Sequence, residues 1–190
     1  MDETTMQNLL ALRNLFFAQH AADLRRAVDA LPATTRRNLP PVPDWDEEEY
    51  AFNSLFVGPK HVEAPPFASV YLDEPSQVMG EATMDARAVY SALGLENPDR
   101  NTFPDDHVSF ELEALVHLAH ARHQAPGKAQ EELYCFFVND HLGVWIPLFV
   151  DRILASEHAT ALFRFAAVLL KRELAGLCSC TVNLQRRETI

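Results

Sequence analysis

Apolar residues recur along most of the chain at intervals of three or four, the spacing that places side chains on one face of an α-helix. The first such stretch covers 5–31, where Thr4 or Thr5 can cap the helix start and Pro32 prevents its continuation. The same intervals predict helices over 46–57, 83–93, 104–125, 128–142 and 159–177, and a further one with Pro147 in its first turn. The alternation of apolar and polar residues that is typical of a β-strand is confined to 67–72. The pattern therefore predicts an all-α protein.

The length of 190 residues fits one helical domain, 1–190, of about seven to ten helices. Ten of the twelve prolines lie between Pro32 and Pro104, so we expect the connections and irregular backbone in that third of the chain. Two subdomains joined by a proline-rich hinge within 96–130 stay open as an alternative. Residues 181–190 lack periodicity and predict a loose tail.

The first residues of the sequence do not predict a secretory signal. Its first residues are acidic where a secretory signal is basic, and no apolar segment follows them. The best apolar segment, 159–170, is shorter than the ~18 residues of a membrane span and contains Arg164. The three cysteines are an odd and sparse set, unlike a secreted disulfide framework. We therefore expect a cytoplasmic protein.

The excess of negative charge is confined to one segment. Residues 38–106 contain fourteen acidic and three basic side chains, which equals the net charge of −11 of the whole chain. Such a segment repels phosphate backbones, so nucleic acid is an unfavourable partner. It would attract a basic peptide or protein, although the ordinary interpretation is that the charges keep the protein soluble.

Enzymatic motifs are scarce. The sequence has no nucleophile elbow, no Walker loop and no dinucleotide-binding glycine motif, and its six glycines offer little material for a phosphate loop. Glu113, His117 and His120 share one helix face, where they could bind a metal. No second helix supplies matching ligands, so a solvated helix face is the ordinary interpretation. A helical metal-binding enzyme that uses these three residues stays as the alternative.

Four sequence blocks, in order and at consistent spacing, resemble one protein family. They are 49–59 (EYAFNSLFVGP), 65–73 (PPFASVYLD), 104–107 (PDDH) followed by Glu111 and Leu112, and 141–149 with His141, Leu142, Trp145, Pro147 and Phe149. Gly80, Arg87 and Gly94 lie between the second and third blocks. Together the blocks resemble the TorD/DmsD family of redox-enzyme maturation chaperones.

The resemblance implies an all-helical, cytoplasmic and non-enzymatic protein without a cofactor of its own. Members of the family bind the twin-arginine signal peptide and the apo form of a molybdenum-cofactor oxidoreductase, and assist cofactor insertion and proofreading before export. The expected partner is therefore a molybdoenzyme catalytic subunit with its signal peptide, and the expected state is a monomer or a domain-swapped homodimer. The alternative within the superfamily is an assembly factor for a membrane-bound nitrate reductase-type enzyme.

The matched blocks suggest the residues of a peptide-binding surface, which are Tyr50, Leu55, Phe56, Pro66, Phe67, Ser69, Tyr71, Asp105, Asp106 and His107. We expect one of the two aspartates to cap the following helix and the other to be free for an arginine of the peptide. Asp105 is the favoured cap, with Asp106 facing the peptide. His107 would either set the pH dependence of that contact or form a hydrogen bond within the loop.

Overall fold

A computed structural model of the protein describes residues 1–58, 62–73, 80–96 and 103–185, with side chains up to Cys178. The regular structure of these residues is helical, which confirms the all-α prediction, and the one extended pairing among them is a single bridge between Phe67 and His107. The elements are α1 (Glu3–Phe16), α2 (Ala21–Asp29), α3 (Ala33–Arg36), α4 (Trp45–Phe52), η1 (Asn53–Val57), α5 (Ser69–Leu72), α6 (Glu81–Ala92), α7 (Val108–Gln124), α8 (Lys128–Cys135), η2 (Phe136–Leu142), α9 (Gly143–Ala155) and α10 (Ala161–Gln185).

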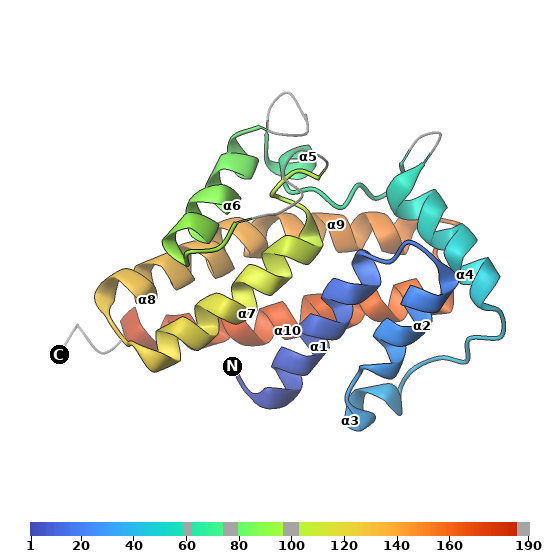
Figure 1. Ribbon diagram of the computed structural model, residues 1–190, viewed down its shortest axis with the longest axis horizontal. Coiled ribbons are helices and arrows are strands. Elements are labelled where there is room, and N and C mark those ends of the chain that lie inside the picture. Colours follow the sequence, from blue (N-terminus) through green and yellow to red (C-terminus); the bar gives the residue numbers. More distant parts are fainter. Residues whose placement is uncertain (59–61, 74–79, 97–102, 186–190) are drawn as a thin grey trace.

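The helices pack around one apolar core. Helices α9 and α10 lie side by side along the long axis, and α1 packs against both α7 and α10 (Figure 1). The largest side chains that this arrangement buries completely are Trp145, Tyr134, Phe16, Phe137, Phe149 and Phe163. Helices α4 to α6 cover the remaining side of the fold, where the connections are longest (Figure 1).

The prediction of a single helix over 5–31 is wrong, because the chain turns between α1 and α2. The carboxylate of Asp23 accepts hydrogen bonds from the backbone amides of Gln19 and His20, both at 3.1 Å, and so stabilises a new helix start. The cap of α1 is Asp2, which accepts a bond from the amide of Thr5 at 2.8 Å, rather than Thr4 or Thr5. The turn leaves Phe17 at the end of α1, only partly buried.

Two predicted helices, 46–57 and 128–142, are helical but end in wide π-helical turns, η1 and η2. Gly58 follows η1 with φ of 100°, a conformation that favours glycine. Gly143 follows η2, and a Cβ atom there would lie 2.8 Å from the carbonyl oxygen of Val138. Both wide turns are therefore closed by a residue that needs to be glycine.

Pro147 lies inside a continuous helix that spans Lys128–Ala155, so its predicted place in a first turn is wrong. This helix is long and apolar enough to cross a membrane by length and composition, with a mean hydropathy of 1.4 in its most apolar window, contrary to the expectation from sequence. Half of that window is buried inside the fold, however, and Trp145 and Phe149 are completely buried. The apolar side chains of this helix therefore form part of the core of the fold.

Most of the remaining boundaries follow the predictions closely, but α7 begins at Val108 rather than at 104 and α10 ends later than predicted. Helix α6 ends before Gly94, which has φ of 69° as expected for a left-handed C-cap. Helix α10 continues to Gln185, five residues into the predicted loose tail, and 186–190 lie outside the described residues. The hinge within 96–130 stays a prediction, since 97–102 also lie outside them.

A completely buried carboxylate, Glu111 of α7, connects α7 to the long helix. It contacts Nε2 of His141 at 2.6 Å and accepts a bond from the indole of Trp145 at 2.9 Å. Burial raises the pKa of Glu111. Burial would lower the pKa of His141, but the charge and hydrogen bond of Glu111 outweigh it and raise that pKa. The pair therefore retains a proton more strongly in the folded protein than in the unfolded chain.

We expect this pair to make the fold less stable in alkaline solution. Because the folded pKa of His141 is raised, its contribution is fully present below the unfolded value of about 6.5 and is lost as pH rises through the folded value. In Glu111→Gln, His141 should lose its proton in the core, so the alkaline loss should disappear. Urea unfolding of both proteins between pH 5.5 and 9 measures the difference, which is about 1.4 kcal/mol per pKa unit. Parallel pH profiles would contradict this assignment.

Candidate functional site

The carboxylate of Asp106, completely buried, joins three segments that are distant in sequence. Oδ2 accepts bonds from the amide and hydroxyl of Ser69, at 2.8 and 2.6 Å, and Oδ1 accepts one from the hydroxyl of Thr83 at 2.8 Å. The backbone repeats the connection, since the amide of Ala68 donates to the carbonyl of Asp106 at 3.1 Å. The loop before α5, the start of α6 and the start of α7 are thus fixed to one another.

Asp105 extends this cluster towards α6. Its carboxylate forms an ion pair with Arg87, with Nη2 at 2.6 Å, and its carbonyl accepts a bond from the hydroxyl of Tyr90 at 2.6 Å. The Asp105 side chain is 4% exposed. The arginine that Asp105 binds is therefore one of this chain.

The expectation that Asp105 or Asp106 caps α7 is wrong, because the residue at the N-cap is His107. Its Nδ1 accepts a bond from the amide of Ser109 at 3.2 Å. Burial lowers the pKa of His107 to about 3, so the ring is neutral at physiological pH. The histidine thus takes the second of its two predicted roles, a hydrogen bond within its own segment. Asp106 does not face a peptide, since its side chain is buried.

An apolar groove lies beside this cluster, with a cavity volume of about 390 Å³. We call it the Phe56 groove, and its lining is formed by Phe16, Phe17, Ala18, Gln19, Phe52, Asn53, Phe56, Val57, Pro66, Phe67, Phe103 and His107. The rings pack on one another, with Phe16 and Phe56 5.6 Å apart and Phe67 and His107 5.2 Å apart. Rings held this way offer a rigid apolar surface. The volume is that of a site for a small ligand or a few side chains.

Helix α4 and η1 connect the groove to an acidic surface. Asn53 and Val57 line the groove, and Val57 is 60% exposed. Tyr50, one turn before Asn53, is 69% exposed, and Asp46, a further turn back, is exposed as well. Of the acidic residues here, Glu48 is buried and accepts a bond from the hydroxyl of Thr160 at 2.6 Å. The exposed face of α4 therefore changes from acidic to apolar towards the groove.

The structure brings four of the ten predicted residues into this groove, namely Phe56, Pro66, Phe67 and His107. Tyr50 lies next to it on α4, whereas Leu55 and Ser69 are completely buried. Tyr71 packs against Trp145 with ring centroids 5.7 Å apart, and its hydroxyl donates to the carbonyl of Pro65 at 2.9 Å. Tyr71 thus belongs largely to the core, and burial raises its pKa.

Sequence reasoning missed the wall that α1 supplies. The single helix predicted over 5–31 includes Phe16 on its apolar face, but neither Phe17 nor Phe103 is singled out from the sequence as a groove residue. The phenylalanine pair at the end of a helical stretch is visible in the sequence. Only the fold shows that the pair lines the same groove as residues 52–57.

The three candidate metal ligands do not form a metal site. Glu113 forms an ion pair with Arg13 at 2.8 Å, and Nε2 of His120 contacts the side-chain amide of Gln124 at 2.7 Å. His117 is exposed on the next turn of α7. Within the described parts of the chain, no group of three or more His, Cys, Asp and Glu residues could hold a metal ion.

Residues 17–151 match a family described as nitrate reductase delta subunit. The chain is 32% identical over 105 residues to the "Chaperone protein TorD" of Vibrio cholerae serotype O1, which covers 53% of this chain and 47% of that protein. It is 31% identical over 102 residues to the "Tat proofreading chaperone DmsD" of Salmonella typhi, covering 53% and 46%. The chain thus spans about half the length of the curated relatives it matches.

The fold is similar to a crystal structure from Archaeoglobus fulgidus that is named as a redox enzyme maturation protein. The TM-score is 0.61 at 22% sequence identity, and the match covers 88% of this chain and 93% of the other. At that identity the likeness concerns the fold.

We expect Asp106→Ala to destabilise the protein by about 3 kcal/mol, because it leaves the buried donors of Ser69 and Thr83 without an acceptor. Asp106→Asn retains one acceptor oxygen, so its loss should be smaller, about 1 kcal/mol. The exposed Asp29→Ala serves as the control, with a change within about 0.5 kcal/mol. Urea unfolding measures all three variants. If Asp106→Ala matched the control, the cluster would not stabilise the fold.

Proposed function

Because the chain belongs to the nitrate reductase delta subunit family, we propose that it is a chaperone of redox-enzyme maturation. Its client is the apo form of a molybdenum-cofactor oxidoreductase, which it recognises by a twin-arginine signal peptide in the cytoplasm. The resemblance to the TorD/DmsD family that the sequence blocks indicated is confirmed by the family match and the names of the relatives. Those names describe chaperones, which supports a non-enzymatic role and assistance in cofactor insertion and proofreading.

The observation that carries the proposal is the Phe56 groove with its acidic approach on α4. A twin-arginine signal peptide presents positive charge followed by an apolar segment. The exposed face of α4 and η1 offers complementary properties in the same order, with the acidic Asp46 followed by Tyr50 and then the apolar Val57. The apolar segment of the peptide would enter the groove, and its basic end would lie over the acidic turn of the helix.

The second candidate function is assembly of a membrane-bound nitrate reductase-type enzyme, which the description of the family favours. In that case the groove would bind an internal apolar segment of the client rather than a signal peptide. Synthetic leader peptides distinguish the two, since only the first function requires that they bind. Monomer and domain-swapped homodimer are both compatible with this proposal.

We expect Val57→Gln to weaken the binding of a leader peptide about fivefold, because a polar amide replaces an apolar wall of the groove, at a cost of about 1 kcal/mol. The fold should tolerate the change, since Val57 is 60% exposed. Val168→Gln, on the exposed side of α10, is the matched control at 56% exposure and should leave affinity unchanged. Titration calorimetry provides the affinities. Equal affinities of the two variants would remove the groove from the proposal.

Salt should slow the association of a basic leader peptide. If the acidic turn of α4 attracts the peptide, the association rate falls as ionic strength rises past ~0.1 M, where the screening length is about 10 Å. The double variant Asp46→Asn, Glu47→Gln should reduce this dependence, and dissociation should change less in both proteins. Stopped-flow measurements at several salt concentrations provide the slopes. An unchanged slope in the double variant would show that α4 does not steer the peptide.

A further inference from the structure

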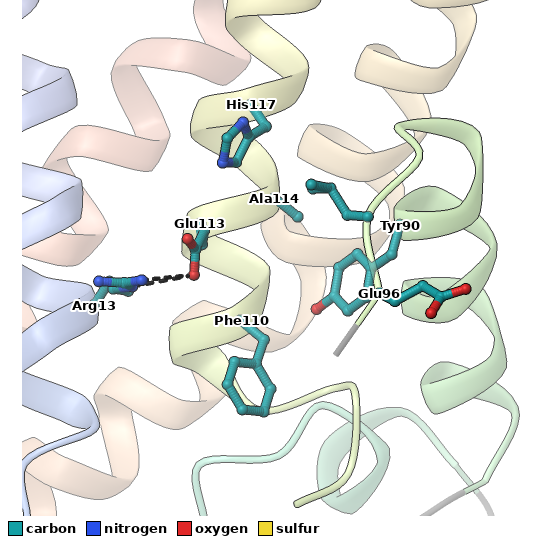
Figure 2. A pocket seen from close by; sticks show the side chains of 8 residues that line it. Arg13, Tyr90, Glu96, Phe110, Glu113, Ala114 and His117 are labelled. Atoms are coloured by element: carbon teal, nitrogen blue, oxygen red, sulfur yellow. Dashed lines mark hydrogen bonds and ion pairs between the residues drawn. The ribbon is translucent and has the colours of Figure 1, made fainter. Parts of the chain in front are cut away.

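A second pocket lies between α1, α7 and the end of α6 with the segment that follows it, and its cavity volume is about 320 Å³. Figure 2 shows Arg13 of α1 and Glu113 of α7 on one side of it and Tyr90 and Glu96 on the other. Phe110, Leu95 and Ala114 supply the apolar part of its lining. We call it the Glu113 pocket. It combines an apolar wall with two carboxylates that are not part of the Asp106 cluster.

The carboxylate of Glu113 already binds a guanidinium group. Nε and Nη2 of Arg13 donate to Oε2 of Glu113 at 3.2 and 2.8 Å (Figure 2). Both bonds end on the same oxygen, so the geometry is not the bidentate pairing in which each carboxylate oxygen accepts one bond. The side chains of Arg13 and Glu113 are 34% and 38% exposed, which makes the pair accessible from solvent.

The lining of the pocket contains two carboxylates and one guanidinium group. The side chain of Glu96 is exposed on the wall opposite Glu113 (Figure 2). The pKa of Tyr90 is raised by burial and then by the charges of surrounding carboxylates, Glu113 among them. Arg13 supplies the one positive charge in the lining that does not depend on the protonation of His117. A cationic ligand is therefore favoured over an anionic one.

The Glu113 pocket adjoins the Phe56 groove. Phe17, in the lining of the groove, contacts Phe110, in the lining of the pocket, with ring centroids 5.3 Å apart. His107 of the groove also contacts Phe110, at 5.7 Å. An extended peptide could therefore place neighbouring segments in both, across these rings.

We propose that the Glu113 pocket accepts an arginine side chain of the bound peptide, which displaces Arg13 from Glu113 while the apolar segment occupies the Phe56 groove. The inference rests on the proposed function and assigns to this pocket the arginine recognition that Asp106, being buried, does not provide. The aliphatic stem of the ligand lies on Phe110 and Leu95, and its planar guanidinium binds both oxygens of Glu113. In the protein without a peptide, the carboxylate of Glu113 forms its ion pair with Arg13.

The first experiment compares three synthetic peptides. One has an arginine pair before an apolar run, the second has a lysine pair in its place, and the third has the arginine pair without the apolar run. Because a planar guanidinium suits bidentate pairing and an ammonium does not, the wild-type protein should prefer the arginine peptide by about tenfold. Glu113→Gln should reduce that preference to about twofold or less. Glu131→Gln, which interrupts the ion pair with Arg122 at the end of α7, should preserve it.

The second experiment removes the internal competitor. Arg13→Gln should tighten binding of the arginine peptide about threefold or more, because no guanidinium has to leave Glu113. Circular dichroism melts of each variant ensure that affinities refer to folded protein. A weaker affinity in Arg13→Gln, or a preference for arginine that survives Glu113→Gln, would overturn the inference. If the inference failed but the lysine peptide still bound through its apolar run, the role proposed for the Phe56 groove would stand. If no peptide bound, the proposed function itself would be contradicted.

Discussion

The carboxylate of Asp106 is the interaction on which the arrangement around the groove depends. It is completely buried, and it accepts hydrogen bonds from Ser69 at the start of α5 and from Thr83 of α6, while the carbonyl of Asp106 pairs with the amide of Ala68. Phe67 and His107 face each other only because this backbone pairing brings their segments together. A buried carboxylate that satisfies several donors is costly to disturb, since each donor would otherwise lie unpaired in the core. The groove is thus a surface held in place by a polar cluster behind it.

The sequence predicted most helices because their determinants are local. The interval of apolar residues and the glycines at 58, 94 and 143 can each be read within a few residues of the chain. The break after Phe16 was missed because a side chain, Asp23, competes there with the helical backbone for the amides of Gln19 and His20. Pro147 was misplaced because the helix upstream of it continues through a wide turn, which periodicity alone does not reveal.

The sequence predicted which region contains the candidate site, but it did not predict the role of each residue there. A sequence shows that Asp105, Asp106 and His107 are polar. Burial decides that the first binds Arg87, that the second connects α5 to α6 and that the third caps a helix. Burial depends on contacts across many residues, such as the 37 that separate Ser69 from Asp106. The same limit applies to the acidic segment, where Glu48 and Asp106 are structural and only a part of the charge faces solvent.

The groove divides its residues into two groups with different freedom to change during evolution. Phe16 and Phe56 line it with one side of their rings and are otherwise part of the core, so their replacement would be selected against through stability. Val57 is exposed and Asn53 is only half-buried, and both sit on the outer side of η1, where substitution leaves the core untouched. The outer wall of the groove can therefore change at a few surface positions, without passing through unstable intermediates.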